Sequence, residues 1–213
     1  MTEEKKDVLV FVFEGFADWE SAYVCTELNG SARYRVRTVG LDGEPVRSMG
    51  GLRVVPDCTV ADHPRGFAAL LLIGGNVWLD GSNDAVLPLV EEALDSGAAV
   101  GGICNAASFL AEHGLLDERA HTGNTLEYLK QCAPHYRGDA LFREEQAVAD
   151  RGVVTANGAG TLEFACAVLS LLEAKPDDDV REWYRLHKEG FYPASNAEPS
   201  IGSRSNDRTS GAS

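Results

Sequence analysis

Several apolar segments of this chain, such as Val8–Phe13 and Ala68–Ile73, are short continuous runs that do not alternate with polar positions. Such runs are typical of strands that are buried on both faces of a parallel sheet. Together with a hairpin-like pair of short segments, the pattern predicts strands at Val8–Phe13, Tyr34–Val39, Leu52–Val55, Ala68–Ile73, Ala98–Ile103, Ala147–Val148 and Val153–Thr155.

Between these strands, apolar residues recur at the three- and four-residue spacing of an amphipathic helix. Alternating strands and helices form βαβ units, so the expected fold class is α/β, with a mostly parallel sheet sandwiched by helices. We expect one such domain over residues 6–193. Apolar residues are nearly absent from residues 194–213, which predicts a flexible polar tail. The predicted helices are Trp19–Leu28, one from Leu87 to just before Gly97, one after Cys104, Thr161–Leu172 and Val180–Lys188.

Cys104 lies where a predicted strand meets a predicted helix, and Ala106, Phe109 and Leu110 mark the apolar face of that helix. A strand, a sharp turn and a helix are typical of a nucleophile elbow, a strained turn that exposes a reactive side chain. The N–H groups and the partial positive charge of the helix N-terminus favour a thiolate, so we expect the pKa of Cys104 to be lowered. The alternative is a buried packing cysteine, because free cysteines are among the most buried residues.

Composition and charge narrow the function classes. The chain has 213 residues and a formal net charge of -14, and an acidic surface repels phosphate backbones, so no nucleic-acid partner is expected. The longest apolar run, Phe67–Ile73, is too short for a membrane span or a signal-peptide core, which predicts a cytoplasmic protein without membrane contact. The 5 cysteines are widely spaced and form no C-x-x-C motif, so neither a disulfide framework nor a metal site is expected.

Three polar or glycine-containing loops follow predicted parallel strands, namely Glu14–Glu20, Gly74–Asn76 and the turn at Cys104. In open α/β sheets, ligands bind beyond the carboxyl ends of the strands. The three loops are therefore expected to meet at one edge of the sheet, and this convergence favours a functional role for Cys104.

Four segments at these positions give the chain its resemblance to a known family. They are Phe16–Glu20 (FADWE), Leu72–Asn76 (LIGGN), Gly102–Ala106 (GICNA) and Asn157–Ala165 (NGAGTLEFA). In this order they resemble the acidic loop, the glycine-glycine loop, the nucleophile elbow and the G-x-G-T-x-x-E-F-A segment of the DJ-1/PfpI superfamily. The resemblance covers roughly Lys6 to Glu173 and implies a flavodoxin-like fold similar to class I glutamine amidotransferases.

The resemblance also implies residue roles. Glu20 matches the family's glutamate next to the nucleophile Cys104, where it is expected to be protonated and to donate a hydrogen bond to the sulfur, because an ionised carboxylate would raise the pKa of the thiol. The alternative for Glu20 is a first-turn acid that interacts with the helix dipole. Asp18 is expected to cap the N-terminus of that helix. Any role it has at the site is expected to be supporting and not catalytic.

Backbone N–H groups at the turn are candidate donors to an oxyanion. We expect one from Gly75, and a second from Asn105 or Ala106 at the start of the helix after Cys104. Gly74 forms the turn that supports Gly75. A simple glycine turn is compatible with this role.

The chain departs from the family where members often carry a histidine. Asn105 follows Cys104, and the downstream turn reads His121-Thr-Gly-Asn124, in which Asn124 aligns with the usual histidine position. His121 is either a general base or a polar surface residue. Glutamine amidotransferases also need a late His-x-Glu, which His187-Lys188-Glu189 does not provide, so glutaminase activity is not expected.

Two functions remain open at this point. The first is a cysteine-dependent hydrolase, hydratase or glyoxalase-type enzyme, in which Cys104 attacks a small electrophilic carbonyl substrate. The second is a redox or stress-response sensor, in which the same thiol is oxidised reversibly. No cofactor is expected, and the resemblance implies a homodimer.

Overall fold

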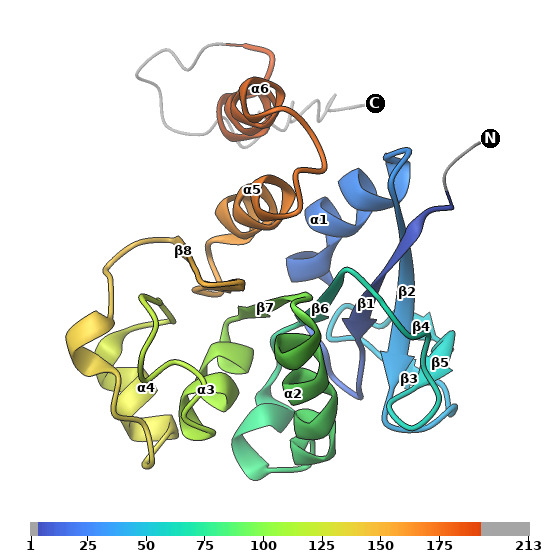
Figure 1. Ribbon diagram of the computed structural model, residues 1–213. Coiled ribbons are helices and arrows are strands. Elements are labelled where there is room, and N and C mark those ends of the chain that lie inside the picture. The colour runs from blue at the N-terminus through green and yellow to red at the C-terminus, as the bar shows by residue number, and fades with distance from the viewer. Residues whose placement is uncertain (1–3, 193–213) are drawn as a thin grey trace, which may run out of the picture.

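The continuous apolar runs form the centre of a seven-stranded sheet in the computed structural model, which describes residues 4–192 of the chain (Figure 1). Neighbouring strands are parallel, except that β8 is antiparallel to β9 at one edge. In spatial order the strands are β5 (Cys58–Thr59), β2 (Tyr34–Gly40), β1 (Lys6–Phe11), β6 (Ala69–Leu72), β7 (Ala99–Ile103), β9 (Val153–Ala156) and β8 (Ala147–Asp150).

Helices cover both faces of this sheet (Figure 1). Helices α1 and α5 lie together on one face and α6 stacks outside α5, whereas α2 and α3 lie on the opposite face with α4 beside α3. The helices are α1 (Asp18–Gly30), α2 (Leu87–Ser96), α3 (Asn105–Glu112), α4 (Leu126–Cys132), α5 (Thr161–Leu171) and α6 (Asp177–Glu189). None of these helices is both long enough and apolar enough to cross a bilayer.

Short elements complete the connections between strands and helices. A separate antiparallel hairpin follows β2, and three single-turn 3-10 helices lie in the longer loops. These elements are β3 (Val46–Arg47), β4 (Arg53–Val54), η1 (Asn76–Asp80), η2 (Asp84–Val86) and η3 (Asp139–Leu141).

The core lies on both faces of the central strands, which are buried along most of their length. Gly101 of β7 allows one of the helical layers to pack closely. A Cβ atom at this position would lie 2.8 Å from Leu71 Cδ2 and 2.9 Å from Phe164 Cζ of α5. The absence of a side chain at Gly101 therefore lets Phe164 pack directly on β7.

The register of the central strands brings the site together. Phe11 of β1 pairs with Leu72 of β6, Leu72 pairs with Gly102 of β7, and Gly102 pairs with Thr155 of β9. The four strands therefore end at nearly the same level. The loops that follow them meet at one edge of the sheet, as the carboxyl ends of parallel strands must.

The predicted fold class is confirmed, and every predicted strand and helix is present within a few residues of its expected bounds. Two predictions need correction. Helix α1 has Ala17 at its N-cap without a side-chain cap, so the prediction that Asp18 caps this helix is wrong. Helix α6 begins at Asp177, because three aspartates can occupy its first turn, where carboxylates interact favourably with the helix dipole. The predicted tail at residues 194–213 lies outside the described residues.

Candidate functional site

Cys104 forms the turn between β7 and α3. Its backbone has φ 59° and ψ -126°, a conformation with positive φ that a residue with a Cβ atom rarely adopts. The Cys104 N–H donates to the carbonyl of Ala156 at 2.9 Å, which ties the turn to the end of β9. The side chain is only partly buried, so the strained turn presents the sulfur at the edge of the sheet.

Glu20 reaches this turn from the first turn of α1. The residue is 1% exposed, and its Oε2 accepts a hydrogen bond from the N–H of Gly74 at 2.8 Å. Burial raises the pKa of Glu20 to about 7, although the hydrogen bonds from Gly74 and from the Cys104 thiol both oppose this shift. At neutral pH the carboxyl therefore exists in both protonation states and can either accept or donate a proton.

The pKa of the Cys104 thiol is raised, which corrects the expectation of a lowered value. Burial is the largest cause, and negative charge on Glu20 is the next. Hydrogen bonds from the Asn124 side chain and the Asn105 N–H lower the pKa but do not reverse the shift. Cys104 and Glu20 therefore form a buried pair in which ionisation of one group disfavours ionisation of the other.

Asn124 lies against the sulfur, in the turn between α3 and α4. Its Oδ1 accepts from the N–H of Gly158 at 2.9 Å, and its Nδ2 lies 3.6 Å from Cys104 Sγ. The N–H of Gly158 can only donate, so the amide oxygen must face Gly158 and the amide nitrogen must face the sulfur. Asn124 can thus stabilise a thiolate but cannot accept its proton.

Two glycines allow the close contacts around Cys104. A Cβ atom on Gly74 would lie 2.7 Å from Cys104 Cβ and would overlap the carboxylate of Glu20. A Cβ atom on Gly158 would lie 3.0 Å from Cys104 Sγ and 3.4 Å from Glu20 Oε1. Gly74 was a candidate from sequence, but the contact role of Gly158 was missed. The glycine-rich segment directly after β9 was the signal for it.

The candidate oxyanion donors lie on both sides of the turn. Within residues 4–192, no protein group accepts the N–H of Gly75, and the first-turn N–H groups of α3 at Asn105 and Ala106 have no partner inside the helix. The Asn105 side chain donates from Nδ2 to the Gly75 carbonyl at 3.2 Å. This contact joins the Gly75 loop to α3 beside Cys104.

His121 is fully buried and both of its ring nitrogens are engaged away from Cys104. Its Nδ1 lies 2.6 Å from the carbonyl of Arg119 and its Nε2 lies 2.6 Å from the hydroxyl of Tyr136. A carbonyl can only accept, so Nδ1 carries the proton and Nε2 accepts from Tyr136. Burial lowers the pKa of His121, and the ring acts as a neutral link between these two groups.

Asp18 lies in the same first turn of α1 as Glu20, but its carboxylate binds to another loop. It accepts from the hydroxyl of Ser48 at 3.0 Å and from the N–H of Gly50 at 3.2 Å. Asp18 therefore holds the tip of the β3–β4 hairpin against the loop that leads to Glu20.

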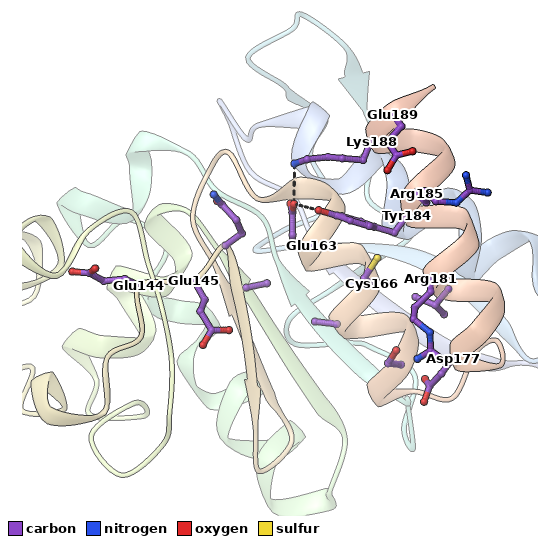
Figure 2. A pocket seen from close by; sticks show the side chains of 15 residues that line it. Glu144, Glu145, Glu163, Cys166, Asp177, Arg181, Tyr184, Arg185, Lys188 and Glu189 are labelled. Carbon is purple, nitrogen blue, oxygen red and sulfur yellow. Dashed lines mark hydrogen bonds and ion pairs between the residues drawn. The ribbon is translucent and has the colours of Figure 1, made fainter. Parts of the chain in front are cut away.

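A separate groove of about 1030 Å³ lies between α5, α6 and the residues that precede β8 (Figure 2). Cys166 and Glu163 of α5 and Tyr184 of α6 are among its lining residues, and none of the residues around Cys104 lines it. Across the described residues, no group of three or more His, Cys, Asp or Glu side chains is arranged to hold a metal ion.

Comparisons with known proteins identify the family that this chain resembles. A family model described as the DJ-1/PfpI family matches residues 6–171. A protein from Bacillus subtilis named uncharacterized protease YoaZ is 36% identical over 87% of this chain and 92% of its own length. A thiJ/pfpI family protein of known structure from Bacillus anthracis is 36% identical, with a TM-score of 0.82 over 87% of this chain and 91% of that one. The glutathione-independent glyoxalase DJR-1.2 of Caenorhabditis elegans is 30% identical over 65% of this chain and 74% of its own length.

Proposed function

We propose that this chain, which belongs to the DJ-1/PfpI family, is a cysteine-dependent enzyme that acts on small electrophilic carbonyl compounds. Cys104 is the nucleophile and Glu20 is the group that moves protons. One relative that shares 30% identity is named a glyoxalase, and we take small α-oxoaldehydes as the first substrates to test.

The proposed reaction begins with attack of Cys104 Sγ on the aldehyde carbon. The new S–C bond forms as the thiol proton passes to the Glu20 carboxylate, and the carbonyl electrons move to oxygen. The N–H groups of Gly75 and of Asn105 or Ala106 stabilise that oxyanion. Glu20 returns the thiol proton to this oxyanion, which gives a neutral hemithioacetal. As a carboxylate it then carries the proton of the attacked carbon to the neighbouring carbon, while the hydroxyl proton passes to the neighbouring carbonyl oxygen. Water cleaves the resulting thioester to a 2-hydroxy acid and the free thiol.

The observation that carries this proposal is the buried Cys104–Glu20 pair. The thiol lies next to a carboxyl group whose pKa burial raises to about 7, so Glu20 can act as a base toward sulfur and then as an acid near neutral pH. The ring nitrogens of His121 are bound to Arg119 and Tyr136. A carboxyl group therefore takes the role that a histidine has in many cysteine enzymes.

The redox-sensor alternative has less support from the geometry. Oxidation by peroxide begins from a thiolate, and its rate follows the thiolate fraction. Burial and the charge on Glu20 both raise the pKa of Cys104, which reduces that fraction at rest. An enzyme that transfers the proton to Glu20 during attack does not need a resting thiolate.

The test is turnover of methylglyoxal and phenylglyoxal, followed by loss of the dicarbonyl and formation of the 2-hydroxy acid. We expect Cys104→Ala to lower kcat by about 10³-fold or more, and Glu20→Gln to lower it by about 10²-fold. The matched control is Cys166→Ala, which removes another half-buried thiol and should leave turnover unchanged. No turnover by the parent protein, or equal turnover by Cys104→Ala, would contradict the proposal.

A further inference from the structure

Two consecutive hydrogen bonds run through Asn105, the residue after Cys104, and end at a tyrosine that the proposed reaction does not use. The hydroxyl of Tyr128, in α4, lies 2.9 Å from Asn105 Oδ1. The Nδ2 of the same asparagine donates to the Gly75 carbonyl at 3.2 Å. Asn105 is 4% exposed, so neither end of its amide has an easy alternative partner in water.

The direction of both hydrogen bonds is fixed by the Gly75 carbonyl. The Gly75 carbonyl can only accept, so the amide nitrogen of Asn105 must face it and the amide oxygen must face Tyr128. An amide oxygen also only accepts, so the Tyr128 hydroxyl must donate its single proton to Asn105. Tyr128 therefore has no proton to give to a substrate while this arrangement holds.

These hydrogen bonds join three elements at this edge of the sheet. Tyr128 belongs to α4, Asn105 is the first residue of α3, and Gly75 precedes η1. The two elements that the Asn105 amide holds together supply the candidate oxyanion donors, the Gly75 N–H and the first N–H groups of α3. A change in the Asn105 amide would thus alter their relative positions.

We propose that Tyr128 is a positioning residue that acts through the Asn105 side chain to hold the oxyanion-binding N–H groups in place. This inference rests on the proposed attack of Cys104 on a carbonyl carbon. Without the Tyr128 hydroxyl, the buried Asn105 oxygen loses its donor and the amide turns to find another. The Gly75 carbonyl then loses its hydrogen bond to α3, and the position of its N–H shifts relative to the first N–H groups of that helix.

The test separates two reactions of the same sulfur. Addition to an aldehyde creates an oxyanion, whereas alkylation by iodoacetamide does not form one at all. We expect Tyr128→Phe to lower kcat for α-oxoaldehydes about tenfold, the effect of one lost hydrogen bond, with little change in KM and in the alkylation rate of Cys104 across pH 5 to 10. Tyr184→Phe is the matched control, because its hydroxyl binds Glu163 in the α5–α6 groove and its loss should change neither reaction.

The pathway through Asn105 is tested by a double-mutant cycle. In an Asn105→Ala background, Tyr128→Phe should have no further effect on kcat, because the connecting amide is already absent. Additive effects of the two substitutions on kcat would overturn the inference. A Tyr128→Phe variant that loses turnover and alkylation rate equally, or that loses neither, would also overturn it.

Failure of the proposed function gives a different result. Reversible addition of an aldehyde to Cys104 protects the thiol from iodoacetamide, and this protection can be measured without turnover. A parent protein that shows neither turnover nor protection would overturn the carbonyl chemistry together with the role of Tyr128. Protection and turnover of the parent, with no lower turnover in Tyr128→Phe, would overturn only the role of Tyr128.

Discussion

Two half-buried cysteines of this protein each lie near a glutamate, but only one of them is in a setting suited to chemistry. Cys104 interacts with Glu20 at the edge of the sheet, and Cys166 lies near Glu163 in the α5–α6 groove (Figure 2). In both pairs, burial raises the pKa of the thiol and negative charge on the glutamate raises it further; for Cys166 the pKa rises to about 11.

The difference lies in what surrounds each pair. The Glu163 carboxylate accepts hydrogen bonds from the hydroxyl of Tyr184 at 2.7 Å and from Lys188 at 3.0 Å. Figure 2 marks both bonds with dashed lines. These bonds lower the pKa of Glu163, so it remains ionised and cannot serve as an acid–base group near pH 7. Cys166 itself lies in the middle of a regular helix, without a positive φ and without a hydrogen bond lowering its pKa.

Cys104 differs at each of these points. Its turn is strained, Asn124 and the Asn105 N–H both donate to its sulfur, and burial raises the pKa of Glu20, whereas hydrogen bonds keep Glu163 ionised. The large groove therefore contains the less reactive pair. The comparison shows that a cysteine next to a carboxylate becomes a candidate nucleophile through its hydrogen-bond donors and backbone, and that the volume of a nearby cavity does not decide this.

The largest expected difference between the two pairs is in how the contribution of each glutamate to the free energy of unfolding depends on pH. The pKa of Glu20 is raised from 4.5 to about 7 in the folded protein, so its contribution is fully present below pH 4.5 and is lost as pH rises through 7. This shift corresponds to about 3 kcal/mol. Glu20→Gln keeps the acceptor for Gly74 but cannot ionise, so relative to the parent it should gain about 3 kcal/mol in free energy of unfolding between pH 4.5 and 8, measured by urea denaturation.

Glu163→Gln is the matched control for this measurement. The pKa of Glu163 is lowered, so its contribution is present above pH 4.5 and is lost as pH falls. This variant should lose about 1 kcal/mol at neutral pH, the value of a partly exposed charged hydrogen bond, and less than that in acid. If the free energies of unfolding of Glu20→Gln and Glu163→Gln changed with pH in the same way relative to the parent, the raised pKa assigned to Glu20 would be wrong.

A smaller effect is expected from adding one methyl group to the Cys104 pair. In Gly74→Ala, the new Cβ lies 2.7 Å from Cys104 Cβ and overlaps the Glu20 carboxylate, so we expect a loss of about 2 kcal/mol and much lower turnover. Gly30→Ala is the control, because no atom lies within 4 Å of its Cβ position. Thermal unfolding of both variants checks this prediction, and equal stability would show that the loop at Gly74 has room to adjust.

The smallest effect concerns the donor that Cys166 lacks. Asn124→Leu removes the N–H group that lies 3.6 Å from Cys104 Sγ, so the pKa of the thiol should rise further. We expect about a tenfold lower alkylation rate at pH 8, corresponding to about 1 kcal/mol. Mass spectrometry that follows each cysteine separately measures this rate. The rate for Cys166 serves as an internal control and should not change.

The sequence predicted the fold well because its strongest signal is local. Apolar runs such as Val8–Phe13 and glycine boundaries such as Gly97 depend on neighbours in the chain, and the structure confirms the elements that they predicted. The short strand β5 and the 3-10 helices were not predicted, because they have two to five residues and no repeating pattern.

The site was harder to predict because its energetics depend on contacts between distant segments. The helix N-terminus after Cys104 suggested a lowered thiol pKa, but burial and Glu20 outweigh it in the folded protein. In the sequence, His121 begins a polar segment that predicts a turn. In the structure, its ring nitrogens bind the Tyr136 hydroxyl and the Arg119 carbonyl. Whether a polar side chain faces the nucleophile or the core depends on packing that no local pattern specifies.

The contacts around Cys104 also set when its chemistry can begin during folding. Glu20 and Gly74 are 54 residues apart in sequence, and Asn124 and Gly158 are 34 apart. Contacts of this range form late, because the entropy of closing long loops must be overcome first. A nascent or partly folded chain therefore carries an ordinary thiol at Cys104, without the paired carboxyl group and the asparagine. The candidate site is assembled only once β1, β6, β7 and β9 lie side by side, so the proposed chemistry can begin only after the sheet is complete.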